Sequence, residues 1–118
     1  MANVYKNIQA IISSAASDVD MYTSPAATTS IVKTIRIFNT HTGPLDVTST
    51  VYDASSTTDF EWDKTNVTAD NHANLLTYNN LLILEAGDIL KMQTATTNVI
   101  KMTASVLQIS RPTEVTTT

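Results

Sequence analysis

The stretch that decides the fold runs from residue 31 to residue 38 and reads Ile31-Val32-Lys33-Thr34-Ile35-Arg36-Ile37-Phe38. Ile31, Ile35 and Ile37 fall on one parity, whereas Thr34 and Arg36 fall on the other. Successive side chains of a strand point to opposite faces, so this period of two predicts a strand with one buried face.

The same alternation returns in segment 45–52, where Leu45, Val47 and Val51 alternate with polar residues. The residues between the two segments, 39–44, have the composition of a turn. The pattern therefore predicts a hairpin with a longer loop.

Further apolar segments extend this pattern along the chain. We expect strands in 19–23, 58–64, 81–84, 89–93 and 99–109, whereas 4–13 suits either a strand or a short helix. The apolar parity of the last strand switches near Val106, which indicates a bulge or a crossing between sheets. Seven or eight strands at a spacing of about ten residues are typical of a sandwich or barrel. We predict an all-β, antiparallel β-sandwich, either immunoglobulin-like or a jelly-roll.

Several side chains have a predicted place in this sandwich. Gly87, in the turn 85–88, is expected at positive φ, a region that glycine tolerates without strain. Trp62 is expected in the core, with Phe60 on its face, although an aromatic residue on a strand can also form a sugar platform. The shared parities predict that these residues are buried between the sheets: Ile35, Ile37, Val47, Val51, Leu84, Leu90, Met102 and Ala104.

Residues 1–110 are expected to form one domain, followed by a polar tail, 111–118. The tail has too little apolar surface to become ordered alone, so we expect a partner or its own domain to hold it. Segment 65–80 is expected to be a long polar loop with one short element, of the kind that is often functional. The residues predicted to contact partners are Thr113, Val115 and Thr117 in the tail, and Asn71, His72 and Asn74 in the loop.

The composition excludes several classes of protein. The chain has 118 residues, a net charge of -4 and a sequence pI of about 4.8, and its seven basic residues are scattered singly. A nucleic-acid-binding protein would show a basic patch, so we expect no nucleic-acid partner. No apolar run is long enough to cross a membrane, and the first residues do not read as a signal peptide. Without cysteine there is no disulfide and no thiolate site.

Candidate catalytic and metal-binding residues are few. His41 and His72 lie in polar segments, and no Gly-x-Ser-x-Gly motif accompanies them. Carboxylates two residues apart, as in Asp18 and Asp20 or in 59–63, could chelate a hard cation, but a solvated sheet face explains them better. We expect no enzymatic activity, no catalytic residue, no cofactor and no metal.

Two stretches resemble small virion proteins of tailed phages, particularly marine or cyanobacterial ones. The first, 21–40, has Tyr22 and Pro25-Ala26 ahead of an isoleucine-rich strand that ends in Asn39-Thr40, and the second comprises 82–91 and 106–109. The resemblance implies a non-enzymatic structural subunit, most simply a capsid decoration or cement protein. It implies assembly in the host cytoplasm into the virion, with the major capsid protein, other virion subunits or further copies of the chain as partners. A tail, baseplate or fibre component and a carbohydrate-binding adhesion module remain the alternatives.

Overall fold

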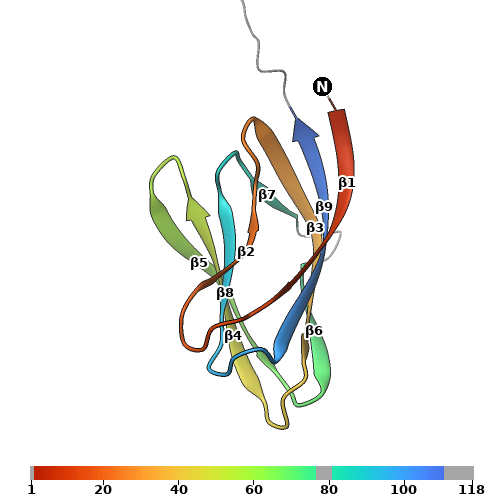
Figure 1. Cartoon of the computed structure of the whole chain (residues 1–118), viewed down its shortest axis with the longest axis vertical. Helices are drawn as coiled ribbons and strands as arrows, with labels where there is room; N and C mark the ends of the chain where they lie inside the picture. The colour runs from red at the N-terminus through yellow and green to blue at the C-terminus, as the bar shows by residue number, and fades with distance from the viewer. Residues whose placement is uncertain (1, 77–80, 111–118) are drawn as a thin grey trace, which may run out of the picture.

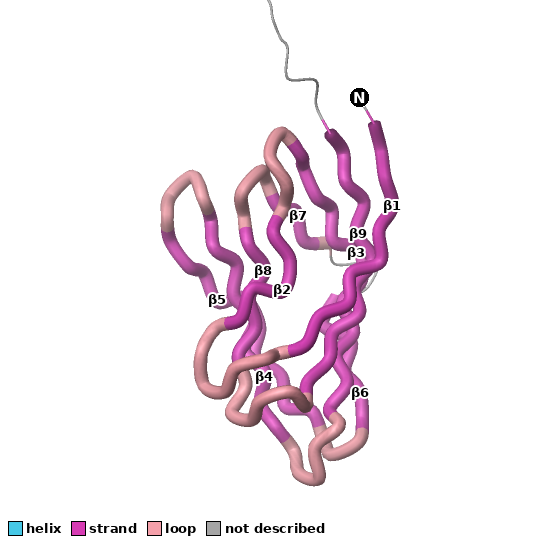
Figure 2. Tube along the Cα trace, in the orientation of Figure 1, coloured by secondary structure: helices cyan, strands magenta, loops and turns pink. Residues whose placement is uncertain are grey.

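The computed structural model describes residues 2–76 and 81–110, which form nine strands and no helix (Figure 1). The strands form two antiparallel sheets packed face to face (Figure 2). The fold is therefore an antiparallel β-sandwich, as predicted. The strands are β1 (Ala2–Ile11), β2 (Val19–Thr23), β3 (Thr28–Asn39), β4 (Leu45–Asp53), β5 (Thr58–Val67), β6 (Asn71–Leu76), β7 (Leu82–Leu84), β8 (Ile89–Gln93) and β9 (Ile100–Ser110).

The strand order is that of a jelly-roll. The five-stranded sheet runs in the order β1-β9-β3-β6, and β7 pairs with the first part of β3 on the same edge as β6. The four-stranded sheet runs in the order β2-β8-β4-β5. When β6 and β7 are counted as one interrupted strand, eight positions remain, and the chain passes repeatedly from one sheet to the other. Of the two sandwich types expected, the observed order matches the jelly-roll.

The predicted hairpin of 31–38 with 45–52 is wrong. β3 pairs with β9, β6 and β7, whereas β4 pairs with β5 and β8 in the opposite sheet. Both strands show one apolar parity because both face the same core from opposite sides. Alternation reports which face is buried but not which strand lies next to it.

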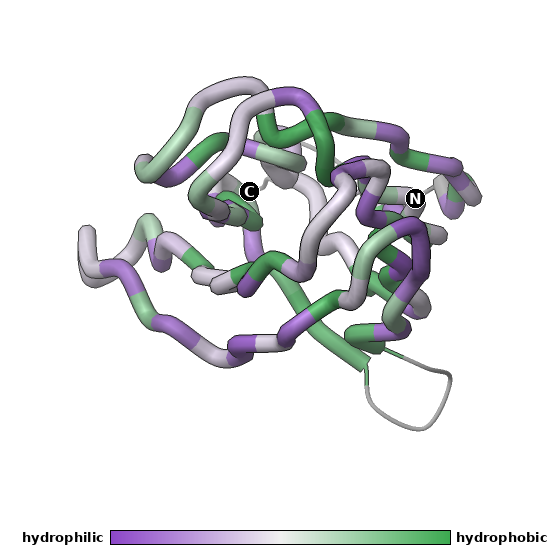
Figure 3. The backbone as a smooth tube through the Cα atoms, turned by 90° about the horizontal axis from the view of Figure 1, so that it is seen from below, coloured by the Kyte–Doolittle hydropathy of each residue, from purple (hydrophilic) through white to green (hydrophobic). Residues whose placement is uncertain are grey.

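The core between the sheets is formed mainly by apolar side chains. Figure 3 shows hydrophobic and hydrophilic residues following one another along the strands of the two layers. Seven of the eight residues predicted to be buried have relative exposures of 0–1%, which confirms their assignment. Val51 is only half-buried and packs at the margin of the core. Trp62 is also half-buried and packs against the core, as predicted, whereas Phe60 is 53% exposed.

Two bulges change the faces that simple alternation predicts. In β3, Val32 lies opposite Val106 and Thr34 opposite Ser105, so Lys33 is an extra residue. The inward side chains are Ser30 and Val32 before the bulge and Ile35 and Ile37 after it. Ile31 therefore does not share the face of Ile35. The predicted irregularity near Val106 exists, but the extra residue belongs to the partner strand.

The second bulge lies in β5, where Glu61 pairs with Thr50 and Asp63 with Ser49, leaving Trp62 as the extra residue. Glu61 and Asp63 therefore lie on opposite faces of the sheet, because their partners Thr50 and Ser49 are consecutive residues of β4. The Asp63 carboxylate accepts a hydrogen bond from Thr65 Oγ1 at 2.6 Å. The carboxylates of 59–63 consequently do not form the single face that the sequence indicated.

Segment 65–80 is not the long loop that its composition predicted. β5 continues to Val67, a turn follows, and β6 occupies Asn71–Leu76, while 77–80 lie outside the described residues. The turn is held by the buried Asn39, whose Nδ2 donates to the carbonyl of Val67 at 3.0 Å. The sequence 4–13 forms most of β1 and is not a helix.

Gly87 has a φ of 87°, as predicted. Its turn does not close a hairpin, because β7 and β8 belong to different sheets. A Cβ at this position would lie 3.2 Å from the Cβ of Ala54, so space as well as backbone conformation favours glycine here.

Candidate functional site

The outer face of the five-stranded sheet, which points away from the four-stranded sheet, carries a row of apolar side chains. Tyr5 on β1 pairs with Leu107 on β9, Leu107 pairs with Ile31 on β3, and Ile31 pairs with Ile83 on β7. Directly paired residues point to the same face, so these four residues, named here the apolar row, lie side by side across four strands. Tyr5 is 72% exposed and Ile83 is 60% exposed.

The bulge in β3 gives the apolar row a charged neighbour. The extra residue, Lys33, places its ammonium 5.3 Å from the centre of the Tyr5 ring, a cation–π distance. A shallow hollow of about 190 Å³ lies beside the pair. Its lining comes from β1, β3 and β9: Tyr5, Lys6, Asn7, Lys33, Ser105 and Val106.

Farther along the same face, the side chains are polar and basic. Arg36 Nε donates to Asn74 Oδ1 at 3.1 Å. Phe38, 39% exposed, pairs with Lys101 on one side and His72 on the other. This end of the face therefore combines positive charge with exposed aromatic surface.

Charge is divided between the two sheets. The strands of the five-stranded sheet contain Lys6, Lys33, Arg36 and Lys101 and no Asp or Glu, which gives them a net charge of +4. The strands of the four-stranded sheet carry two lysines, Lys64 and Lys91, and six acidic residues, a net charge of -4. The six are Asp20, Asp46, Asp53, Asp59, Glu61 and Asp63.

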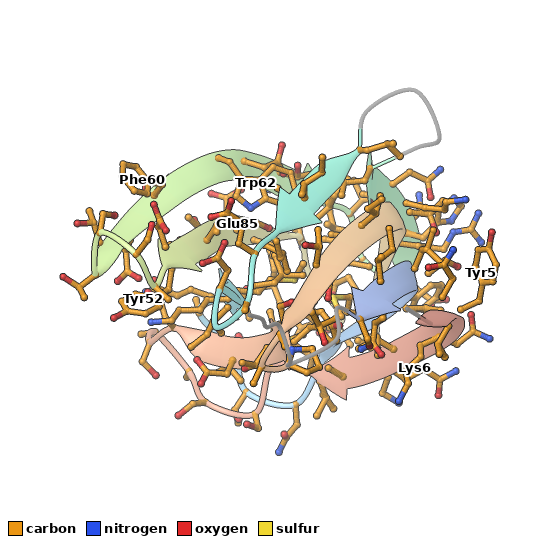
Figure 4. All side chains as sticks on the ribbon, turned by 90° about the horizontal axis from the view of Figure 1, so that it is seen from above. Tyr5, Lys6, Tyr52, Phe60, Trp62 and Glu85 are labelled. Carbon is orange, nitrogen blue, oxygen red and sulfur yellow. The ribbon has the colours of Figure 1, made fainter. Side chains whose placement is uncertain are left out.

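The outer face of the four-stranded sheet is built around Lys91. Its Nζ lies 3.4 Å from Asp59 Oδ1 and 5.1 Å from the centre of the Tyr52 ring. A second hollow, of about 240 Å³, includes Asp46, Glu61 and Lys64 in its lining. Figure 4, viewed along the sandwich, shows Tyr5 and Tyr52 on opposite sides of the molecule.

The turn between β4 and β5 contains Asp53, a carboxyl group with a displaced pKa. Hydrogen bonds from the Ser55 and Ser56 hydroxyls hold the pKa of Asp53 below its ordinary value of 3.8. Because Ser55 Oγ and N both donate to Asp53 Oδ1, the arrangement stabilises the turn.

Three of the six predicted partner-contact residues lie in the described part of the chain. Asn71, His72 and Asn74 are exposed on β6, and Asn74 bonds to Arg36 on the basic part of the face. Asn71 bonds locally, donating to Thr68 Oγ1 at 3.2 Å. Thr113, Val115 and Thr117 lie outside the described residues.

The candidate catalytic and metal-binding residues form no cluster in the described part of the chain. His41 is half-buried in the loop after β3, where its Nδ1 accepts a hydrogen bond from the Gly43 N–H at 3.1 Å. Within residues 2–76 and 81–110, no three His, Asp or Glu side chains come together as metal ligands. The same residues include no helix that could span a membrane.

The apolar row was missed in the sequence because its members sit next to core residues. Ile31 precedes the buried Val32, and Leu107 follows the buried Val106. Consecutive apolar residues in a strand place one side chain on each face. Such pairs in two strands were the available signal for an apolar outer face.

No family model and no curated protein matches the chain. A solved structure of the CBM22-1 and GH10 modules of endo-1,4-β-D-xylanase 10B from Clostridium thermocellum, complexed with xylohexaose, is similar over 95% of this chain. The sequence identity is 14% and the TM-score 0.41, and the match spans 23% of that chain.

Proposed function

We propose that the chain is a non-enzymatic structural subunit of a tailed-phage particle, with capsid decoration as its first role. The observation that supports this most is the apolar row, an exposed strip across four strands whose end residues are more than half exposed. Contiguous exposed apolar surface of this kind marks protein contact sites. The motifs in 21–40 and 82–91 support the choice of a phage particle.

The fold is compatible with this role but does not establish it. Jelly-rolls occur in viral capsid proteins and also in lectins, so the surface has to supply the argument. A subunit that works by contact needs a stably packed domain and an exposed surface that a partner can cover. The apolar core packs the two sheets together, and the outer face of the five-stranded sheet presents the apolar row for contact.

The test is the protein content of purified particles. Virions of the phage whose genome encodes this chain, separated by density gradient, should contain it in many copies per particle when measured by quantitative mass spectrometry against the major capsid protein. A decoration protein should be removable while the capsid stays closed, whereas a tail component should be present in few copies. Absence of the chain from purified particles would refute the proposal.

A carbohydrate-binding module is the second candidate, and one observation favours it. The Tyr5 ring is widely exposed beside a shallow hollow with Asn7 and Lys33 in its lining, an arrangement suited to stacking on a sugar ring. Trp62 no longer serves this role, because it packs against the core. Binding of the purified chain to an array of glycans, lost in Tyr5→Ala, would establish this function.

A further inference from the structure

The two outer faces of the sandwich are complementary in charge. We propose that the five-stranded sheet of one copy docks on the four-stranded sheet of a second copy, an inference that rests on the proposed role as a structural subunit. The docking surface is the apolar row together with Lys33, Arg36 and Lys101. Its occupant is the face that carries Asp20, Asp46, Asp59 and Glu61.

The first argument is that the basic side chains of this face form no ion pair with any described residue of their own copy. Among the described residues the structure forms one ion pair, between Lys91 and Asp59, and both belong to the four-stranded sheet. Lys33, Arg36 and Lys101 make no ion pair there, and their strands offer no carboxylate. Charges of opposite sign on another molecule steer association and fix its orientation.

The second argument is that the apolar surfaces align as well. Ile31 lies near the start of β3 and Leu107 near the end of β9, so the apolar row lies toward one end of the sandwich. Figure 1 shows that β3 begins and β4 ends at this same end. On the other face, Tyr52 pairs with Ile89 near that same end, while Asp46 lies at the far end of β4. Two copies stacked with the same orientation therefore bring apolar surface against apolar surface.

The same stacking brings the charges together. Arg36 and Lys101 lie beyond the apolar row toward the end of β3, and Glu61 and Asp46 lie beyond Tyr52 toward the start of β4. A pairing of two five-stranded faces would instead place lysines and arginine against each other. Charge thus favours unlike faces, and apolar surface favours a common orientation.

This contact joins two different surfaces of the same chain. Each added copy leaves one face of each kind free, so the contact repeats, and it closes into a ring or continues as a stack according to the rotation between neighbours. A ring around a symmetry axis of the particle, or a stack along a tail or fibre, would present many copies of the domain.

Sedimentation velocity of the full chain at micromolar to millimolar concentration tests the proposal. The mean mass of the wild type should rise with concentration and fall as salt is added, because salt screens the attraction. Two double variants, Arg36→Glu with Lys101→Glu and Asp46→Lys with Glu61→Lys, should each remain monomeric. An equimolar mixture of the two variants should associate again.

The control is Glu85→Lys, a charge reversal in the exposed turn between β7 and β8, which should associate like the wild type. Circular dichroism and thermal melting should first show that every variant is folded. A wild type that is monomeric throughout the range would overturn the proposal. Loss of association in the Arg36 and Lys101 variant alone, but not in the Asp46 and Glu61 variant, would assign the docking surface to a different occupant.

These outcomes are separable from the proposed function. A chain that is monomeric in solution but abundant in particles would overturn the stacking and keep the virion role, with an acidic surface of another subunit as the occupant. A chain that associates as described but is absent from particles would overturn the virion role and keep the stacking.

Discussion

The carboxylate of Asp88 accepts a hydrogen bond from the backbone N–H of Ala54, with 3.0 Å between Oδ1 and N. Its Oδ2 accepts another from the N–H of Glu85 at 2.9 Å. The backbone carbonyl of Asp88 accepts the N–H of Ser24, also at 2.9 Å. One buried residue therefore joins three turns at one end of the sandwich.

Replacing Asp88 with Ala should lower the free energy of unfolding by about 2–4 kcal/mol. The loss leaves two backbone N–H groups without the charged acceptor that satisfies them. Asp88→Asn should retain part of the stability, since its amide keeps one acceptor oxygen. Urea denaturation measures the difference, and Asp18→Asn, in the exposed loop before β2, serves as the control with little expected change. Equal stability of wild type and Asp88→Ala would show that the hydrogen bonds to the Asp88 carboxylate do not contribute to the free energy of unfolding.

Gly87→Ala should destabilise the domain by about 1–2 kcal/mol, because alanine is strained at a φ of 87° and its Cβ would approach Ala54 closely. Gly43 offers a matched comparison, because a Cβ there would meet its nearest neighbour, His41, at 3.7 Å. Gly43→Ala should stay within about 0.5 kcal/mol of wild type. Thermal melting of both variants distinguishes the two sites, and the same loss at both would contradict the explanation.

Val47→Asp should prevent folding or cost more than about 4 kcal/mol, because the side chain at this position is 0% exposed and the carboxylate would have no partner. Val51→Asp should cost less, about 1–3 kcal/mol, since a half-buried position lets the carboxylate reach water. Chemical denaturation of the pair tests the order. A Val51→Asp protein less stable than Val47→Asp would reverse the assignment of core and margin.

The pKa of Asp53, followed by NMR, should lie below 3.8 and move back toward it in Ser55→Ala. The pKa is lowered in the folded state, so the stabilisation from the charged carboxylate is fully present above the unfolded pKa. It is lost as the pH falls through the lower folded value. An Asp53 pKa that is the same in Ser55→Ala as in the wild type would contradict the role given to the Ser55 hydroxyl.

Structural features that are set by neighbouring residues could be predicted from the sequence, whereas features that depend on residues far apart in the chain could not. Burial of Ile35, Met102 and Leu90 followed from local parity, because each strand has one face against the core. The pairing of β3 with β9 instead of β4 had no local signal, because neighbours in the sheet are far apart in the chain. The positive φ of Gly87 was predictable because few other residues tolerate that conformation.

The candidate contact surface was predictable only in part. Asn71, His72 and Asn74 were expected on the surface, where the structure places them, but as parts of a loop and not of β6. Apolar neighbours such as Ile31-Val32 indicate apolar side chains on both faces of a strand, but the alignment of the apolar row depends on the extra residue in β3 and on the registers of four strands. A bulge reverses the parity of everything beyond it without any distinctive composition.

The repeated passage of the chain between the sheets has a consequence for how the protein forms. β4 and β5 are neighbours in both sequence and sheet, whereas the β1–β9 register joins Ala2 to Ser110. Bringing together residues that are far apart in the chain costs conformational entropy before their contacts form, and this cost slows folding. The domain should therefore fold in roughly milliseconds to seconds. During synthesis, β1 has to wait for β9 to emerge from the ribosome, and β3 waits with it. Until then β1 and the edge of β3 that faces β9 have unpaired backbone N–H and C=O groups, which are open to pairing with another chain.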